Sequence, residues 1–485
     1  MSITIFGVIV ILVGLALLLG GSMTSMLAFV MVTCLFGGSA AFSLPSLGGS
    51  TIPPANLALV FLLLRAIMPG PRQMAELGRA FSDNIALMIF GFYGSISAFL
   101  LPRLFAGAAQ VTPLRPGAVR QLYEVAPVHF SSQNITTSVY LLGTAAAGLC
   151  GTIGAARPNS ERLIVRVGIV IAILHAALGF LSVAVANTRL NAIIDAFRNG
   201  HYAQLDQSIS GLSRMTGIWP EASGFAAFGG AWLIFMTELW LRGIRPRTTG
   251  FAAVFLTSAL ALSTSSTAYV TLLGYAGVLG LRTLLVPTSI PIRKVLLGIA
   301  ALLAAAIAAL AVVVLLPRMF DEVTRILNVM IVNKAESSSG HQRFFWALQG
   351  LQVFVVSAGF GIGAGSFRSS SLITAILGSM GVIGFASFAV HILRAFRPLH
   401  GSTWLAYEPD ERKAVGAAAS WTALLMLMPA SIAAPSPDPG IVWATFAGIA
   451  LGLRRAPSSA QGPVSRRREA AVRAYANAPR GRLSA

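Results

Sequence analysis

Long apolar runs, separated by polar connections, occupy most of this chain. An α-helix needs about 20 predominantly apolar residues to cross the hydrocarbon core of a membrane. The strands of a membrane β-barrel would instead give short segments of alternating hydrophobicity, and the runs do not alternate. They predict thirteen membrane-spanning helices, or twelve if one pair is merged, over 3–20, 23–44, 52–68, 84–102, 138–156, 163–187, 222–241, 250–264, 267–281, 295–317, 371–395, 415–432 and 440–453.

The composition excludes a soluble globular protein. The chain has 485 residues, of which 55% are hydrophobic and only 11% charged, whereas a soluble domain carries about 25% charged residues. Cys34 and Cys150 both lie in apolar runs, where neither a disulfide framework nor a thiolate metal site is expected. The predicted fold class is all-α, with a polytopic transmembrane domain over 1–453 and a basic tail over 454–485 that we expect to be disordered.

The distribution of Lys and Arg predicts the orientation, because short connections on the cytoplasmic side of a membrane protein carry an excess of these residues. Of the 35 basic residues, 24 lie in five short connections and the tail, and 11 lie in three long loops. The connections that we expect on the cytoplasmic side, together with the tail, are 65–79, 157–166, 242–247, 282–294 and 394–413. The long loops that we expect on the outer side are 103–137, 188–221 and 318–370.

The net charge of +19 is then mainly a signal of topology, with a basic tail beside anionic membrane lipid. Nucleic acid is not an expected partner, because the basic residues do not gather on one module with stacking aromatic residues.

The third long loop carries the candidate chemistry. Its first part, RMFDEVTRILNVMIVNKA at 318–335, has apolar residues at three- and four-residue steps, which predicts a helix lying in the membrane interface. A hinge is expected over 334–342. The segment 343–360 predicts a short helix that inserts partway and lines a cavity, since irregular backbone at membrane depth requires cover by protein or water.

Two arginines flank the end of this loop. Arg343 begins the short helix, and Arg368 follows a GxGxG turn over 361–365. No strand precedes the turn, so it is a poor signal for nucleotide binding. We interpret it as a tight turn that brings Arg368 and exposed backbone N–H groups near an anion. The alternative is that each arginine only reaches to the lipid headgroups.

The order of several segments resembles the O-antigen polymerase and ligase superfamily of bacterial inner membranes, which includes exopolysaccharide polymerases. The matching segments extend over most of the chain from about residue 84 onward. They are LLPRLF at 100–105, PVHFSSQNITTSVYLL at 127–142, SRMTGIWPEASGFAAFGGAW at 213–232, ALALSTSSTAYVTLL at 259–273, the stretch from Gly340 to Phe385, and SIAAPSPDPGIVWATF at 431–446.

This resemblance implies a glycosyltransferase of the C-type fold that works without metal or cofactor. It implies undecaprenyl-diphosphate-linked oligosaccharides as substrates, and a chain-length regulator and export machinery as partners. The family's diphosphate-binding arginines carry over to Arg214, Arg343 and Arg368. Guanidinium groups suit this role, because they make bidentate, permanently charged contacts with phosphate oxygens.

The base for the acceptor hydroxyl is left open. His341, Glu221 and Glu124 are the candidates in the outer loops, and for each the alternative is a solvated loop residue. Ligases of the superfamily carry a histidine, then Asn, Ser or Gln, then nine further residues, and then a Gly-x-x-[Gly/Thr/Tyr] motif. Counting back from Gly381 and Gly384 places Ser370 at that position, which favours polymerisation over ligation.

We therefore expect a polymerase of lipid-linked repeat units at the periplasmic face of the inner membrane, in exopolysaccharide, capsule or O-antigen biosynthesis. The alternatives are ligase-type transfer of polymer to an acceptor, and a flippase for lipid-linked oligosaccharides. Flippases tend to bury charges within their helices, whereas the arginines of interest here lie in loops.

Overall fold

The computed structural model describes residues 2–44, 50–70, 73–114, 124–186, 188–200, 208–209, 212–298, 300, 307, 338–396 and 410–455. Helices dominate these residues. They are α1 Ile5–Gly20, α2 Met23–Thr33, α3 Pro54–Ile67, α4 Gln73–Asp83, α5 Ile85–Leu104, α6 Ser132–Ala155, α7 Ser160–Ala184, α8 Asn191–Ala196, α9 Ala222–Leu241, α10 Pro246–Leu262, α11 Ser266–Leu285, η2 Pro287–Ser289, α14 Ser338–Val356, α15 Leu372–Phe396, α17 Glu411–Leu425, α18 Leu427–Ala433 and α19 Ile441–Leu453.

The all-α polytopic class is confirmed. Within the described residues, seven helical segments are long and apolar enough to cross a membrane, and four apolar helices are shorter. Every predicted span except 295–317 overlaps one of the helices given above. Most of 295–317, the interface helix expected at 318–335 and nearly all of the tail lie outside the described residues.

Three short antiparallel sheets supplement the helices. β1 Ser2–Ile3, β2 Phe42–Leu44 and β3 Ser50–Ile52 form one sheet in that order. β4 Gln110–Val111 pairs with β5 Ala126–Pro127, and β6 Ser208–Ile209 pairs with β7 Leu212–Ser213.

The span predicted at 23–44 is too long. α2 ends at Thr33, and the chain then turns at Gly37 and Gly38. A Cβ at Gly37 would lie 2.5 Å from the Trp219 ring, and one at Gly38 would lie 2.4 Å from the Ile218 carbonyl oxygen. The close approach of the 213–221 segment to Gly37 and Gly38 therefore requires glycine at both positions, and these residues lie in the turn that follows α2.

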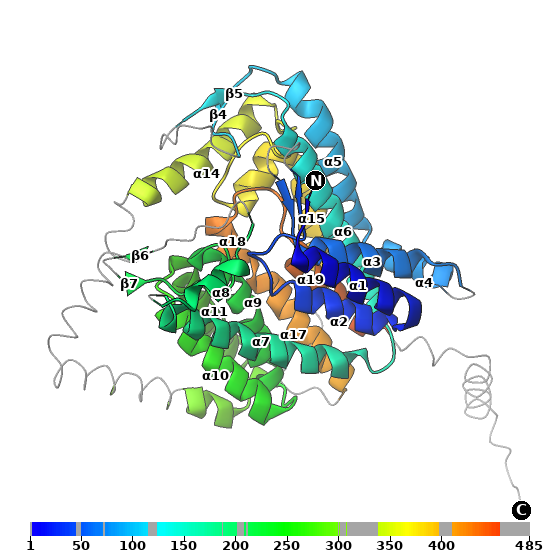
Figure 1. Ribbon diagram of the computed structural model, residues 1–485, viewed down its shortest axis with the longest axis vertical. Coiled ribbons are helices and arrows are strands. Elements are labelled where there is room, and N and C mark those ends of the chain that lie inside the picture. Colours follow the sequence, from blue (N-terminus) through cyan, green and yellow to red (C-terminus); the bar gives the residue numbers. More distant parts are fainter. Residues whose placement is uncertain are drawn as a thin grey trace, which may run out of the picture.

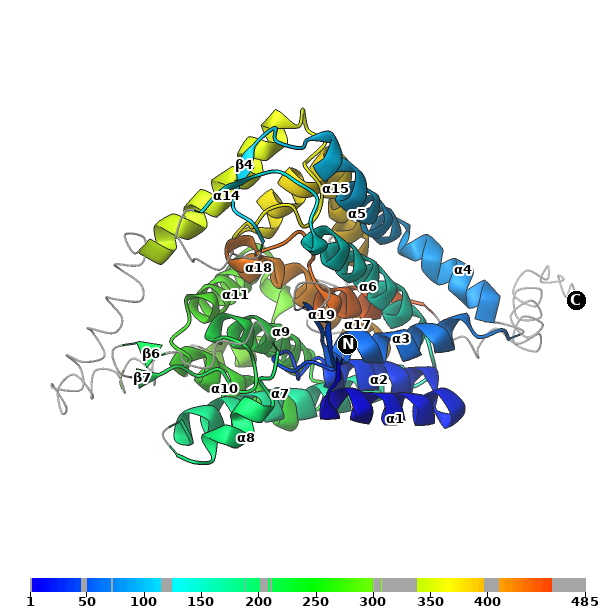
Figure 2. The same ribbon diagram turned by 45° about the horizontal axis from the view of Figure 1, so that its top comes forward.

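α6 and α19 pack closely at the centre of the bundle (Figures 1 and 2). The two helices run in the same direction, because Gly148 lies beside Ala444 whereas Ala155 lies beside Gly452. A Cβ at Gly452 would lie 2.4 Å from the Thr152 carbonyl oxygen. Small residues at four-residue spacing allow such an approach of two membrane helices.

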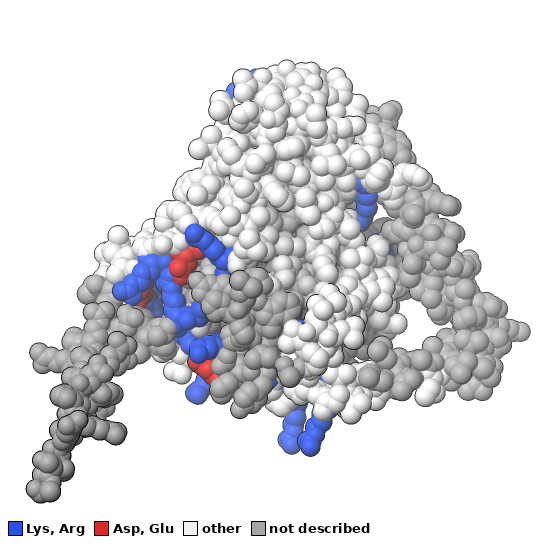
Figure 3. Space-filling model, turned by 180° about the vertical axis from the view of Figure 1, so that it is seen from behind, with Lys and Arg blue, Asp and Glu red and all other residues white. Residues whose placement is uncertain are grey.

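The connections separate onto two faces. On one face, which we call the short-loop face, ion pairs join connections that were predicted to share a side. Arg157 pairs with Glu76 at 2.6 Å. Figure 3 shows one charged patch, on the same side of the molecule as α4, and a mainly uncharged surface over most of the other described residues in this view. The ion pairs Arg412–Glu161 and Arg455–Asp83 join further connections there.

The opposite face, which we call the long-loop face, carries the three predicted outer loops. The backbone N–H of Arg368 donates to the Thr112 carbonyl at 2.8 Å, and Asn134 Nδ2 donates to the Ala364 carbonyl at 2.8 Å. In Figure 1, β4–β5 lie at the top and β6–β7 at the left, away from α4 at the right. The pairing of connections expected from the basic residues is thus present in the fold.

Candidate functional site on the long-loop face

Arg214 lies in the segment that leads from β7 to α9. Its Nη2 donates to the Thr264 carbonyl at 3.2 Å, in the turn between α10 and α11. Thr264 has a positive φ of 51°, a conformation that costs a non-glycine residue free energy and that tends to occur at functional sites. This contact places the Arg214 guanidinium beside the outer ends of two membrane helices.

Arg343 lies in α14, and the structure corrects the expected start of that helix. α14 begins at Ser338, so the residues from 338 to 342 are helical and are not a hinge. Arg343 Nη1 donates to the Ile432 carbonyl at 3.4 Å, and the Arg343 carbonyl accepts a hydrogen bond from Ser370 Oγ. These contacts attach α14 to α18 and to the start of α15.

Arg368 lies between α14 and α15, as expected. Its guanidinium carbon is 4.6 Å from the centroid of the Trp346 ring, which is a cation–π distance. Arg368 Nε has no hydrogen-bond partner among the described residues. The backbone and the aromatic ring therefore position this guanidinium, while part of its donor capacity is unused.

The three arginines share one electrostatic environment. Burial lowers the pKa of the Arg214 guanidinium, the nearby Glu221 carboxylate opposes that shift, and Arg343 adds to it. Burial likewise lowers the pKa of Arg368, again opposed by Glu221 and reinforced by Arg343. Arg214 from one long connection and Arg343 and Arg368 from another therefore lie within electrostatic range of Glu221 or of one another. We call Arg214, Arg343 and Arg368 the arginine cluster.

The arginine cluster differs from five arginines of the short-loop face because its members form no salt bridge with another described residue. In the described part of the chain, none of its three members forms a salt bridge, whereas Arg157, Arg242, Arg282, Arg412 and Arg455 all do. Cations that are half-buried and held close to one another repel, so an anion that bridges them is favoured.

The three base candidates occupy different positions. Glu221 is exposed, directly precedes α9, and accepts a hydrogen bond from Ser223 Oγ. His341 is exposed in the first turn of α14. Glu124 lies just before β5 and forms no hydrogen bond or ion pair with the arginine cluster among the described residues, and its Oε2 is buried without a partner. Glu221 is the candidate that the structure places in the electrostatic field of Arg214 and Arg368.

The first three N–H groups of the GxGxG turn are occupied within the protein and are not presented to an anion. The N–H groups of Ile362 and Gly363 donate to the Gly378 and Ser379 carbonyls at 2.8 and 2.9 Å, and Gly361 N donates to Ser357 Oγ at 2.8 Å. Gly361, Gly363 and Gly365 have φ values of 83°, 101° and 88°. The glycines serve close packing, because a Cβ at Gly365 would lie 2.5 Å from the Gln133 carbonyl oxygen.

Two residues near this face escaped the sequence analysis. Trp346 appeared only as an apolar residue of a helix. Asp438 lies between α18 and α19 and accepts hydrogen bonds from Thr144 Oγ1 at 2.6 Å and from Gly440 N at 3.1 Å.

Asp438 lies deep in the bundle. Thr144 is twelve residues into α6, which corresponds to ~18 Å along its axis. α17 and α18 together, Glu411–Ala433, are long enough to cross a membrane, whereas α19 has 13 residues, so the chain between α18 and α19 returns to the depth of Thr144. Non-helical backbone at membrane depth is tolerated where protein or water covers it.

No protein-family model, no curated protein and no solved structure matches this chain. The function is therefore argued from the geometry of the site.

Proposed function

We propose that this protein is a glycosyltransferase that joins undecaprenyl-diphosphate-linked oligosaccharide repeat units. The observation that carries the proposal is the arginine cluster, in which three guanidinium groups from separate segments lie together without a salt-bridge partner in the described part of the chain. A lipid-linked diphosphate is a ligand of matching charge at the end of a membrane anchor. The proposal includes the bacterial inner membrane as the location, with the long-loop face toward the periplasm and the tail toward the cytoplasm.

The reaction needs anion stabilisation more than any other assistance. The acceptor hydroxyl attacks the anomeric carbon of the donor sugar, the bond from that carbon to the diphosphate oxygen breaks, and the electron pair leaves with the diphosphate. Fixed cations that meet developing charge in a site of low water content are usually the largest catalytic term. Arg214, Arg343 and Arg368 supply such cations.

The proton of the acceptor hydroxyl goes to a carboxylate in this scheme. Glu221 is the preferred acceptor because it lies near two of the three guanidinium groups. His341 and Glu124 are the alternative proton acceptors.

Polymerisation is favoured over ligation by the position of Ser370. This residue stands where the ligases of the resembling superfamily carry histidine, and its hydroxyl donates to the backbone carbonyl of Arg343. A serine hydroxyl engaged in this way is a poor proton acceptor at neutral pH. Ser370 therefore supports the helix that carries Arg343 and leaves proton transfer to another group.

The test is carried out in a strain that lacks the gene, complemented with variants at matched protein level. Arg343→Ala and Arg368→Ala should each lower polymer yield by about 10- to 150-fold, because a hydrogen bond to a charged group contributes ~1.5–3 kcal/mol. Arg→Lys at the same positions should also impair transfer, since the bidentate fork is lost. Arg189→Ala is the matched control, because Arg189 is exposed in a long loop away from the arginine cluster.

The lipid-linked sugars distinguish the alternatives. Single repeat units on the carrier, with loss of long polymer, are expected for a polymerase. Long polymer that is not attached to its acceptor would indicate a ligase, and repeat units confined to the cytoplasmic side would indicate a flippase. Wild-type polymer from both alanine variants would mean that the arginine cluster serves packing only.

A further inference from the structure

A second basic site lies on the short-loop face, at the opposite end of the bundle from the arginine cluster. A cavity of about 540 Å³ opens there between the start of α2, the end of α3, the start of α4 and the turn between α6 and α7. Its polar lining includes Arg65, Arg157, Gln73, Ser22 and Thr24. The proposed transferase reaction uses none of these residues.

Arg65 contributes a cation with weak internal contacts. Its Nη2 lies 3.4 Å from the Gly21 carbonyl and its Nη1 lies 3.6 Å from the sulfur of Met68. It forms no salt bridge within the described residues. Gln73 Nε2 donates to the Arg65 carbonyl at 2.6 Å, so the backbone of Arg65 is fixed while its guanidinium keeps donors for another acceptor.

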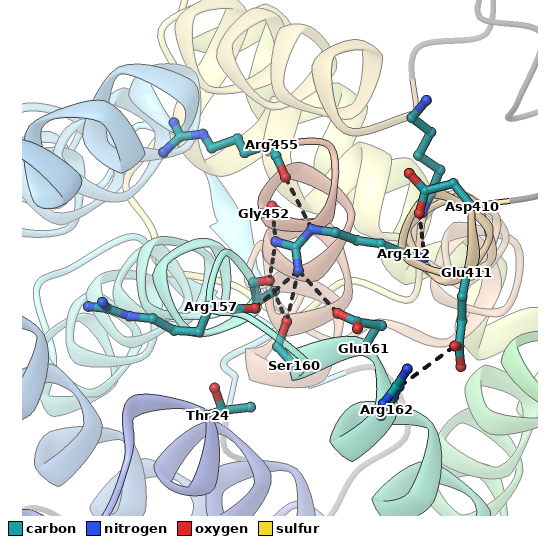
Figure 4. A network of polar contacts seen from close by, with 12 residues as sticks. Thr24, Arg157, Ser160, Glu161, Arg162, Asp410, Glu411, Arg412, Gly452 and Arg455 are labelled. Atoms are coloured by element: carbon teal, nitrogen blue, oxygen red, sulfur yellow. Dashed lines mark hydrogen bonds and ion pairs between the residues drawn. The ribbon is translucent and has the colours of Figure 1, made fainter. Parts of the chain in front are cut away.

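Arg157 contributes the second cation, and its backbone is held firmly. The Arg157 carbonyl accepts from Arg412 Nη1 at 3.1 Å. Figure 4 shows the Arg157 side chain pointing away from the Arg412 guanidinium. The side chain pairs with Glu76 at 2.6 Å, and 30% of it is exposed. The Arg157 guanidinium is thus prepositioned and accessible, with one carboxylate as an internal competitor.

The start of α2 adds to the positive potential. Ser22 caps this helix and accepts from Ser25 N at 3.0 Å, and the next two residues line the cavity. The first N–H groups of a helix carry partial positive charge that favours anions. The two arginines remain the main determinants.

The surroundings indicate a ligand with an apolar part. Met23 and Leu163 line the cavity beside the cations. α1 ends directly before the cavity, and its last turns expose Leu15 and Leu19, the latter at 85%. These leucines lie on an apolar helix of a membrane protein, so an acyl chain can lie along α1 while a headgroup occupies the cavity.

We propose that this cavity binds the phosphate headgroup of an anionic membrane lipid, with Arg65 and Arg157 as the phosphate-binding cations. Two guanidinium forks match phosphate oxygens in charge and geometry. Glu76 then regulates affinity, because it competes with the phosphate for Arg157. The site holds lipid against the ends of α1, α2 and α3, which lie side by side (Figures 1 and 2).

The experiment measures lipid retention by the purified full chain in neutral detergent with native mass spectrometry. Dioleoylphosphatidylglycerol is the probe, dioleoylphosphatidylcholine is the zwitterionic comparison, and inorganic phosphate is the free anion. Arg65→Ala and Arg157→Ala should each weaken phosphatidylglycerol binding by about tenfold or more. Arg162→Ala should leave it unchanged, since Arg162 lies near the same turn, does not line the cavity and is 61% exposed.

Glu76→Gln separates a binding role from a structural one. It removes the competitor of Arg157 and should tighten phosphatidylglycerol binding severalfold, whereas weaker binding would mean that the ion pair is needed only to build the cavity. Arg65→Lys keeps the charge and should retain part of the affinity. Equal phosphatidylglycerol binding by the wild type and the Arg65→Ala/Arg157→Ala double variant would overturn the assignment to a lipid. Inhibition of lipid binding by millimolar inorganic phosphate would overturn it as well.

Discussion

The guanidinium carbon of Arg368 lies 4.6 Å from the centroid of the Trp346 ring. The aromatic face holds the cation in place. A carboxylate in the same position would neutralise its charge, whereas the ring does not. A cation–π contact contributes ~0.5–2 kcal/mol. A residue that binds a diphosphate needs this combination of a fixed position and an available charge.

This relationship yields the first prediction. Trp346→Leu should lower polymer yield by about 2- to 30-fold, the range that corresponds to one cation–π contact. Trp346→Phe should keep part of the activity because an aromatic face remains. The control is Trp240→Leu, since Trp240 makes a similar contact with Lys294 at 5.2 Å on the short-loop face. Equal losses from both leucine variants would assign the effect to general packing.

The glycine turn leads to a second prediction, about stability. Gly365→Ala should destabilise the protein strongly, because the added Cβ meets the Gln133 backbone at 2.5 Å in addition to the strain of a φ of 88°. Gly107→Ala is the matched control, since Gly107 has a φ of 72° and open space around it. Gly107→Ala should lower the free energy of unfolding by only ~1–2 kcal/mol, which is the cost of the left-handed conformation for a non-glycine residue. Thermal unfolding in detergent gives the comparison, and similar costs for the two would refute close packing at Gly365.

Arg412 provides a third prediction. Its guanidinium donates to the Ala155, Arg157, Gly452 and Arg455 carbonyls and to Ser160 and Glu161 (Figure 4). Arg412→Ala removes a donor from each of these acceptors and the ion-pair partner of the buried Glu161 carboxylate, which should cost about 3–5 kcal/mol. Arg412→Lys should recover only part, because an ammonium has three donors.

The exposed neighbour Arg162 serves as the control for Arg412. Arg162→Ala should change the unfolding temperature little, since exposed ion pairs contribute about 0–1 kcal/mol. If both alanine variants unfold at the wild-type temperature, Arg412 does not join the helix ends as described.

The two faces give a prediction about sidedness. A cysteine at Ala108, exposed on the long-loop face, should react with a membrane-impermeant maleimide added to whole spheroplasts, whereas one at Ala75, exposed on the short-loop face, should react only after lysis. The native Cys34 and Cys150 are buried and should stay unlabelled. The reverse pattern would invert the proposed orientation and remove the arginine cluster from the periplasm.

Much of the architecture is determined by the sequence alone. The span predicted at 222–241 coincides with α9, and that at 371–395 is one residue away from α15. Crossing a membrane is a local requirement on the length and hydrophobicity of one segment, so a single sequence contains the information. The grouping of connections onto two faces follows in the same way, because each span reverses the side.

The tertiary structure decided the properties that depend on distant partners. Gly37 is required after α2 only because Trp219 approaches it, and the N–H groups of Ile362 and Gly363 are occupied only because the Gly378 and Ser379 carbonyls lie opposite. The same holds for charge. Arg157 and Arg368 are the same type of residue, yet Arg157 faces the Glu76 carboxylate and Arg368 faces the Trp346 ring. Hydrogen bonding and electrostatics act over a few ångströms, so the side chains that the fold brings together decide which arginine is paired and which one keeps its charge available.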